Sequence, residues 1–346
     1  MRAVFFLQGE RVPASRARGF ALARALSTRG VTCELRIARP SVYGDTKLPW
    51  PLDQPRWLYV PFAALARLGQ LRDLRQDDVI IFQRPMTELA TIALERWAAR
   101  GRKTIFDFDD AIFERQWGAA AKFRRLVALA DRVVAGNRHL ANAAAAPDKT
   151  VIVPTAVDTD RFAATPLRAT RGSDVVIGWT GLSGNYPHLA HRVEAIARAL
   201  KRTSARFVVI SDRPPPRSLA ALNAEFVRWR PESEVADLAR IDVGVMPLPD
   251  GPYERGKCAF KLLQYMALGR PGVASPIGAN SEVVTDKVDG FLPSTDDAWE
   301  EALTLLIEDP ALRQEIGVRA RARVEAGYSL SVVADRYKTV IEALAG

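Results

Sequence analysis

The sequence predicts an α/β protein made of two Rossmann-like, doubly wound domains that face a central cleft, followed by C-terminal helices. First, 346 residues exceed what one hydrophobic core usually organises, which favours two domains. Second, short apolar runs rich in β-branched and aromatic residues alternate with Ala-, Leu- and Arg-rich helical stretches, and this pattern occurs twice. The two cysteines form no CxxC pair, which argues against a disulfide framework or a structural zinc site.

We place the first domain at residues 1–168. Its helices include Ala17–Arg29 and Thr87–Arg100, and a linker without periodicity follows at Thr165–Asp174. The expected strands are Ala3–Leu7, Thr32–Ile37, Val79–Phe82, Thr104–Phe108, Arg132–Val134 and Thr150–Val153.

The second domain is expected over residues 173–328. Asp309 and Pro310 mark the start of a helix. A last helix is expected within residues 329–346, and one possibility is that it packs back on the first domain. The expected strands are Val175–Trp179, Arg206–Ser211, Phe226–Trp229, Val243–Met246 and Pro271–Ala274, with helices at Leu189–Lys201, Glu234–Ala239 and Phe260–Leu268.

The net charge of +9 is spread along helical segments, for example at Arg319, Arg321 and Arg323. It forms no basic block with interleaved aromatic residues, so we expect no nucleic-acid partner. Two interpretations remain open, namely solvated helix faces and attraction to anionic partners such as a nucleoside diphosphate or the inner face of a membrane. We expect a cytoplasmic protein, with peripheral contact with that membrane face as an option.

Loops at the carboxyl ends of parallel strands form ligand crevices, and the richest such loop is Pro252–Pro271. Lys257 and Lys261 are four residues apart, so both would share one face of a helix that began near Lys257. A helix amino end with two lysines suits a diphosphate, whereas the alternative is a pair of solvated lysines. Gly256 and the apolar stripe that follows indicate a turn pressed against the core.

Residues 261–275, KLLQYMALGRPGVAS, resemble the donor-binding helix and following strand of glycosyltransferase family 4, the group 1 retaining enzymes of the GT-B fold. The segment at 278–284 resembles the family's turn whose backbone amides contact the donor phosphates, and 289–292 resembles its closing strand. Residues 177–182 resemble the first strand of the donor domain, and 151–162 resemble the end of the first domain.

This resemblance implies a nucleotide-diphosphate sugar as donor substrate, with no cofactor and no metal. The implied donor-binding residues are Gly181, Leu182, Glu254, Gly256, Lys257, Lys261, Gln264, Ala279, Asn280, Ser281 and Glu282.

The sequence departs from the family at two glutamates, which correspond here to Gly256 and Gln264. Gln264 can still bond a ribose hydroxyl through its amide, and Glu254 is the nearest candidate for the sugar contact. The family's Arg and Lys after the first donor-domain strand are also missing, so Lys257 and Lys261 become the expected neutralisers of leaving-group charge.

Three carboxylates, Asp107, Asp109 and Asp110, lie at the end of an expected strand. Clustered carboxylates raise one another's pKa and are typical of catalytic or cation-binding sites, whereas the alternative is helix capping by Asp109 or Asp110. Within the resemblance, Asp109 or Asp110 would position or deprotonate the acceptor hydroxyl, and Asp107 would contribute to acceptor binding.

The loop after the first strand is expected to contact the acceptor through Gly9, Ser15, Arg16 and Arg18. Ser15 would cap the following helix. The two arginines would either bind an anionic acceptor or simply be solvated. His188 and His191 have no third ligand nearby, so no metal site is expected.

The expected function is therefore a glycosyltransferase of hexosyltransferase type that acts with retention, in cell-envelope polysaccharide or glycolipid synthesis, on a glycan or lipid-linked acceptor. One alternative is a magnesium-dependent phosphatase of the haloacid-dehalogenase type, with Asp107 as nucleophile and Asp109 as acid and base. Another is a non-catalytic protein that binds a nucleotide sugar or a polyanion.

Overall fold

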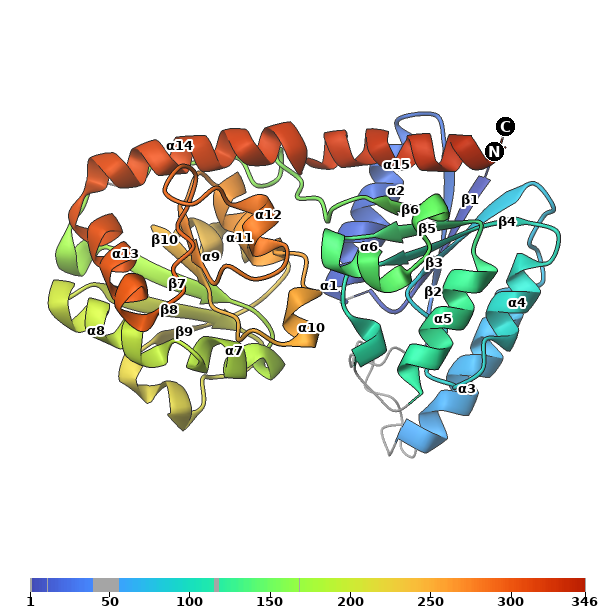
Figure 1. Ribbon diagram of the computed structural model, residues 1–346, viewed down its shortest axis with the longest axis horizontal. Helices are drawn as coiled ribbons and strands as arrows, with labels where there is room; N and C mark the ends of the chain where they lie inside the picture. The colour runs from blue at the N-terminus through green and yellow to red at the C-terminus, as the bar shows by residue number, and fades with distance from the viewer. Residues whose placement is uncertain (1, 11, 40–55, 115–117, 168, 346) are drawn as a thin grey trace. The chain divides into compact units, whose positions relative to one another are not determined.

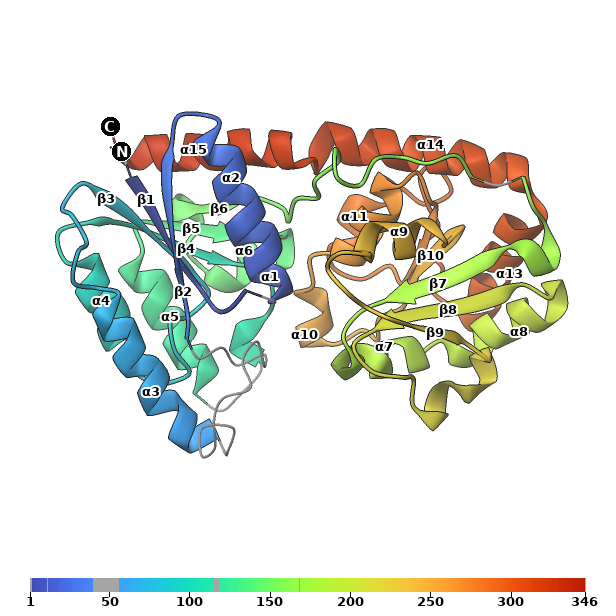
Figure 2. The same cartoon turned by 180° about the vertical axis from the view of Figure 1, so that it is seen from behind.

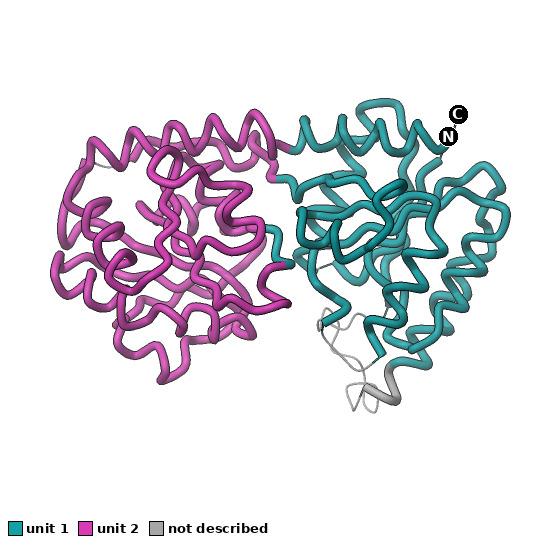
Figure 3. Tube along the Cα trace, viewed as in Figure 1, with its two compact units in different colours: residues 1–156, 256–258, 330–346 teal, residues 157–255, 259–329 magenta. Residues whose placement is uncertain are grey.

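The computed structural model describes residues 2–10, 12–39, 56–114, 118–167 and 169–345. The chain forms two compact units (Figure 3). Unit 1 comprises Met1–Ala156, Gly256–Cys258 and Leu330–Gly346, and unit 2 comprises Val157–Arg255 and Ala259–Ser329. No helix in the described part of the chain is long and apolar enough to cross a membrane.

Unit 1 contains a parallel sheet with the strand order β2-β1-β3-β4-β5-β6 (Figure 1). The direction of strand succession reverses between β1 and β3, which makes that point the topological switch where ligands bind in open α/β sheets. The strands are β1 (Arg2–Leu7), β2 (Thr32–Ile37), β3 (Asp78–Gln83), β4 (Lys103–Phe108), β5 (Arg132–Ala135) and β6 (Thr150–Ile152).

Helices cover both faces of this sheet. Helices α2 and α15 lie side by side on the face that carries Phe5 and Leu7, as Figures 1 and 2 both show. On the other face, Phe123 of α5 contacts Phe106 and Phe108 with ring centroids 5.7 and 5.0 Å apart. The helices are α1 (Pro13–Ser15), the π-helical η1 (Arg16–Ala21), α2 (Leu22–Ser27), α3 (Arg56–Gly69), α4 (Ala93–Ala99), η2 (Ile112–Glu114), α5 (Ala119–Leu129), α6 (Arg138–Ala144), η3 (Pro147–Lys149) and α15 (Leu330–Ala345).

Helix α3 is anchored to the sheet of unit 1 by the side chain of Arg67. Arg67 is 1% exposed, and its guanidinium donates to the carbonyl oxygens of Leu7 at 2.5 Å and Arg36 at 2.8 Å. It thereby fixes the helix to the carboxyl ends of β1 and β2. The opposite side of α3 exposes Phe62, Leu65 and Leu68 by 48%, 62% and 44%.

Unit 2 contains a second parallel sheet with the order β11-β10-β7-β8-β9, whose switch point lies between β7 and β10. The strands are β7 (Val176–Thr180), β8 (Arg206–Ser211), β9 (Glu225–Arg228), β10 (Val243–Met246) and β11 (Gly272–Ala274). The helices are η4 (Gly172–Asp174), η5 (Ser183–Asn185), α7 (Tyr186–Ala190), α8 (Val193–Thr203), η6 (Arg217–Leu222), α9 (Glu234–Ala239), α10 (Pro252–Arg255), α11 (Phe260–Ala267), α12 (Asn280–Val283), α13 (Asp296–Glu308) and α14 (Pro310–Gly327).

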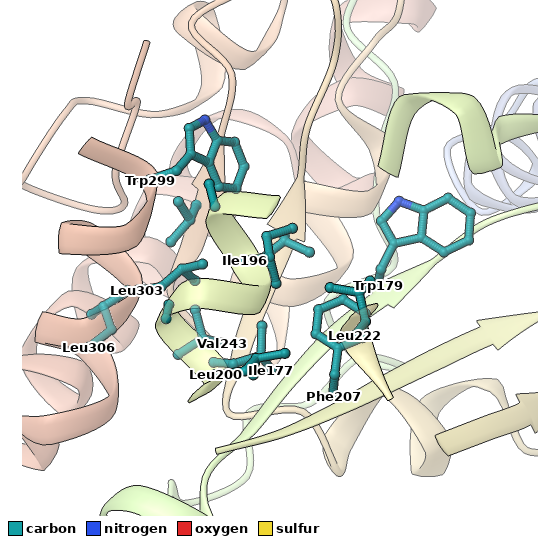
Figure 4. Packing of buried hydrophobic residues seen from close by; sticks show 14 of the residues in the cluster. Ile177, Trp179, Ile196, Leu200, Phe207, Leu222, Val243, Trp299, Leu303 and Leu306 are labelled. Atoms are coloured by element: carbon teal, nitrogen blue, oxygen red, sulfur yellow. The ribbon is translucent and has the colours of Figure 1, made fainter. Parts of the chain in front are cut away.

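Two apolar clusters sandwich the second sheet. One packs Ile177 and Val243 against Ile196 of α8 and Leu303 of α13 (Figure 4). The other packs the opposite face against α9, α11, α12 and α14, and it includes Val157 and Phe162. Residues 157–167, which were expected in the first domain, therefore belong to unit 2, where the side chains of Val157 and Phe162 are buried.

The predicted α/β architecture is confirmed, and every expected strand is present within one or two residues of its predicted limits. Asp309 starts α14 as predicted, since its Oδ1 accepts from the N–H groups of Ala311 and Leu312. The prediction of a helix at Thr87–Arg100 is wrong in its start, because α4 begins at Ala93.

Candidate functional site

The switch point of unit 2 joins two loops through a polar pair. His188 lies on α7 after β7, and Glu254 lies on α10 after β10. His188 Nε2 is 3.0 Å from Glu254 Oε1, and the side chains are 12% and 16% exposed. Because this pair lies where ligands enter sheets of this order, it is placed to meet a bound molecule.

Lys261 lies in the first turn of α11 and packs beside the end of β7. Its Nζ is 5.6 Å from the ring centroid of Trp179, within the range of a cation–π contact. A Cβ on Gly181 would come within 2.7 Å of the Trp179 ring and 2.9 Å of Lys261 Cε. Glycine at 181 therefore lets the loop after β7 approach the lysine closely.

The loop after β7 is also fixed by Asp212, which follows β8. The Ser183 N–H donates to Asp212 Oδ1 at 2.6 Å, and its hydroxyl donates to Oδ2 at 3.1 Å. Burial opposes the charge on this carboxylate, but these hydrogen bonds outweigh it and hold the pKa of Asp212 below its usual range. The loop therefore has a defined shape before any ligand binds.

The turn at 278–282 uses several of its own amides. The N–H groups of Asn280, Ser281 and Glu282 donate to carbonyls within the turn, at 3.0 to 3.2 Å. Gly278 has φ +53°, and a Cβ there would lie 2.4 Å from the Arg255 carbonyl oxygen. Asn280 is 1% exposed, and Ala279 is 4% exposed. The predicted contacts to phosphate thus lie in a turn that is tightly packed against the loop after β10.

Gln264 of α11 belongs to a cluster of polar side chains that also contains Glu234 and Arg161. It is 4% exposed, and its Nε2 is 3.4 Å from Glu234 Oε1. Glu234 also forms an ion pair with Arg161 at 2.7 Å. The carboxylate of Glu234 therefore already orients Gln264, the side chain predicted to contact the ribose.

Lys257 does not lie on α11, so it does not share a helix face with Lys261 as it would in a helix that began near Lys257. The helix begins at Phe260, after Ala259 takes the left-handed conformation with φ 55°. Residues 256–258 belong to unit 1, where Asn137 Nδ2 donates to the Lys257 carbonyl oxygen at 3.1 Å. A Cβ on Gly256 would come within 2.7 Å of the Ala111 backbone nitrogen.

In unit 1, Asp107 forms a buried ion pair with Arg18. Arg18 Nε and Nη2 lie 2.7 and 3.0 Å from the two carboxylate oxygens, and the two residues are 3% and 0% exposed. Burial opposes the charge on the arginine, but the carboxylate outweighs it and holds the pKa of Arg18 above its usual range. The expectation that Arg18 projects from the helix is therefore wrong, and Asp107 is not presented to a substrate.

Ser15 does not cap the helix, contrary to prediction. It is the last residue of α1, whose N-cap is Val12, and its hydroxyl accepts from the Gln8 N–H at 3.3 Å. Ser15 and Gly9 are buried, whereas Arg16 is half-buried. Of the predicted acceptor loop, Arg16 is thus the more open charged side chain.

Asp109 and Asp110 bind Arg84, a residue that was not among the expected site residues. Arg84 Nη2 lies 2.6 Å from Asp109 Oδ1 and 2.6 Å from Asp110 Oδ2. The signal for Arg84 in the sequence is its place directly after a buried strand, beside the switch point. No group of three or more His, Cys, Asp or Glu residues that could hold a metal occurs in the described ranges.

Solved structures with this fold match nearly the whole chain. They include Anabaena Alr3699/HepE in complex with UDP and glucose, with 15% identity, a TM-score of 0.70, and coverage of 99% of this chain and 100% of that chain. Sucrose-phosphate synthase (tll1590) from Thermosynechococcus elongatus has 15% identity, a TM-score of 0.72, and coverage of 99% and 98%. A glycosyltransferase from Rickettsia africae ESF-5 has 15% identity, a TM-score of 0.69, and the same coverage.

The chain has two sheets of parallel strands covered by helices, and the solved structures above share this arrangement. These two observations define a protein of the GT-B fold. Residues 174–309 match the family described as glycosyl transferases group 1. Apart from Gly256–Cys258, the matched residues lie in unit 2. No curated protein is significantly similar to it in sequence.

We predict that Asp107→Asn lowers the free energy of unfolding by about 3–5 kcal/mol, because it leaves the Arg18 charge buried without a counterion. The double variant Arg18→Met, Asp107→Leu should lose less than the sum of the two single losses, because neither charge remains. Denaturant unfolding measures each value. The control is Asp335→Asn, which breaks a pair with Arg29 whose carboxylate is 64% exposed and should cost less than about 1 kcal/mol. Parental stability of Asp107→Asn would contradict the structural role.

Proposed function

We propose that this protein is a glycosyltransferase, which moves a sugar from a nucleoside diphosphate sugar, bound by unit 2, to an acceptor hydroxyl bound by unit 1. The observation that carries the proposal is the conjunction of Lys261, Gly181 and the His188–Glu254 pair at the switch point of unit 2. HepE is solved in complex with UDP-glucose, which makes this sugar nucleotide the first donor to test.

In the proposed reaction, the bond between the sugar's anomeric carbon and the diphosphate oxygen breaks, and its electron pair stays on the diphosphate. The acceptor oxygen bonds to the anomeric carbon, and its proton passes to the carboxylate of Asp109 or Asp110. Lys261 and Lys257 offset the charge that develops on the leaving group. Retention of anomeric configuration is proposed from the family resemblance alone.

The remaining donor contacts are proposed by position. Gln264 would bond the ribose, and the backbone of the loops after β7 and β11 would contact the diphosphate. Arg16 and the main chain at Gly9 would contact the acceptor, for which we propose a cell-envelope polysaccharide or a lipid-linked glycan. Arg18 and Asp107 would position the neighbouring residues without touching substrate, since both are buried.

We predict that Lys261→Ala lowers kcat on the order of 100-fold with UDP-glucose, because an electrostatic stabiliser of the leaving group is lost. UDP-glucose should raise the melting temperature of the parent and raise that of the variant less. Lys201→Ala, which removes an exposed lysine of the same unit, should behave like the parent. Parental turnover by Lys261→Ala would remove this lysine from the mechanism.

We predict that Glu254→Gln weakens UDP-glucose binding about 10- to 100-fold and leaves UDP binding unchanged, because a hydrogen bond to a charged group is lost only at the sugar. Titration calorimetry with both ligands separates these two affinities. Asp250→Asn is the matched control, since its carboxylate lies in the same loop but is 57% exposed. Equal weakening for UDP and UDP-glucose would show that Glu254 does not contact the sugar.

We further propose that α3 contacts the inner face of an anionic membrane. Phe62, Leu65 and Leu68 recur every three residues and share one face of the helix, opposite the buried Arg67. Burial of Arg67 together with exposure of Phe62, Leu65 and Leu68 reverses the pattern that is usual in a soluble protein. The net charge of +9 adds attraction to anionic lipid.

This proposal predicts co-sedimentation of the protein with vesicles that contain anionic lipid, and weaker binding as salt is added. Replacing Phe62, Leu65 and Leu68 together by serine should abolish the binding. Val318→Ser, which removes an apolar side chain of α14 that is 62% exposed, is the control and should bind like the parent. Unchanged binding of the triple variant would exclude α3 as the contact.

A further inference from the structure

Arg84 follows β3 beside the switch point of unit 1 and has an unusual backbone. Its φ is 67°, a left-handed backbone conformation that residues other than glycine rarely adopt. Its N–H donates to the Asp107 carbonyl oxygen at 2.8 Å, so the conformation is held by the neighbouring strand β4. Strain of this kind persists where the surrounding structure determines it, and it concentrates at functional sites.

The Arg84 guanidinium bridges two carboxylates. Nη2 lies 2.6 Å from Asp109 Oδ1 and 2.6 Å from Asp110 Oδ2, and Nε lies 3.0 Å from Asp109 Oδ1. The arginine side chain is 5% exposed, whereas the two carboxylates are 11% and 21% exposed. The cation is thus on the buried side of the cluster, and the anions are the more open part.

Two neighbouring carboxylates without a cation tend to share one proton, because both cannot ionise without repulsion. Arg18, Asp107 and Cys258 also interact electrostatically with this pair. Arg18 forms an ion pair with Asp107, and burial raises the pKa of the Cys258 thiol well above its usual range. Arg84 is the cation whose guanidinium bonds both carboxylates of the pair.

We infer that Arg84 is a positioning residue that keeps Asp109 and Asp110 ionised and fixed in one orientation, so that one of them can accept the proton of the acceptor hydroxyl. This inference rests on the proposed function, in which these carboxylates activate the acceptor. The planar fork of arginine suits the task, because it holds two oxygens at defined positions where a lysine supplies only a point charge.

The test is the pH profile of kcat/KM for sugar transfer by Arg84→Gly. Glycine accepts a positive φ without strain, so this variant removes the guanidinium without keeping a strained backbone. We expect the acidic limb to move up by about one to two pH units, with much of the lost rate recovered at high pH and the donor KM unchanged. Arg84→Lys retains the charge and should keep its limb near that of the parent.

Arg2→Gln is the matched control. Arg2 bridges Glu34 at 2.7 Å and Asp78 at 2.6 Å, at the amino end of the same sheet. Its loss should lower stability and leave the pH profile unchanged. If Arg84→Gly instead lowers kcat/KM by the same factor at every pH, its role is only structural and the inference fails.

A second measurement does not depend on turnover. With ¹³C-labelled aspartate, the carboxyl signals that disappear in Asp109→Asn and Asp110→Asn identify the pair, and their titration should move to higher pH in Arg84→Gly. An unchanged titration would overturn the inference whatever the activity. Full sugar transfer by both asparagine variants would remove the base from the proposed function, and with it the catalytic part of this inference, even where the titration shifts.

Discussion

The organisation of unit 2 depends on how closely α11 approaches its sheet. The Tyr265 ring occupies the space above Gly244 of β10, where a Cβ would lie 2.1 Å from the ring. Its hydroxyl accepts from the Thr180 N–H at 2.9 Å, at the end of β7. One side chain therefore spans the two strands of the switch point, and it sets the position of Lys261 one helical turn earlier. A side chain at position 244 would push the helix, and the lysine with it, away from the loop after β7.

Unit 1 places charge at the corresponding end of its own sheet, and burial divides that charge into two parts. Asp107 is fully enclosed with Arg18, so these two groups stabilise the end of the strand and contribute no net charge. Asp109 and Asp110 share the guanidinium of Arg84, and their carboxylates are the more open side of this cluster. Carboxylates that already keep contact with solvent can meet a substrate without a large cost of desolvation.

The sequence was sufficient for the strands and the two-sheet architecture, because alternation of apolar runs and helical stretches is a local signal. The residues that pair with Asp107 and Asp109 could not be predicted from such local signals. Arg18 comes from η1 and Arg84 follows β3, and only the parallel crossovers bring them to the end of β4. The helix expected at Phe260–Leu268 is confirmed, but Ala259 adopts a left-handed conformation that its residue type does not announce, and this keeps Lys257 outside α11.

The departure of position 256 from the family's glutamate has a steric explanation. Gly256 lies so close to Ala111 that even a Cβ would come within 2.6 Å of the alanine Cβ and 2.7 Å of its backbone nitrogen. A glutamate cannot occupy this position unless that backbone moves, and the same backbone carries Asp109 and Asp110. The sugar contact that we propose for this loop therefore falls to another residue. Glu254 is two positions earlier, and His188 already orients its carboxylate, so this proposed contact is compatible with the tight packing at 256.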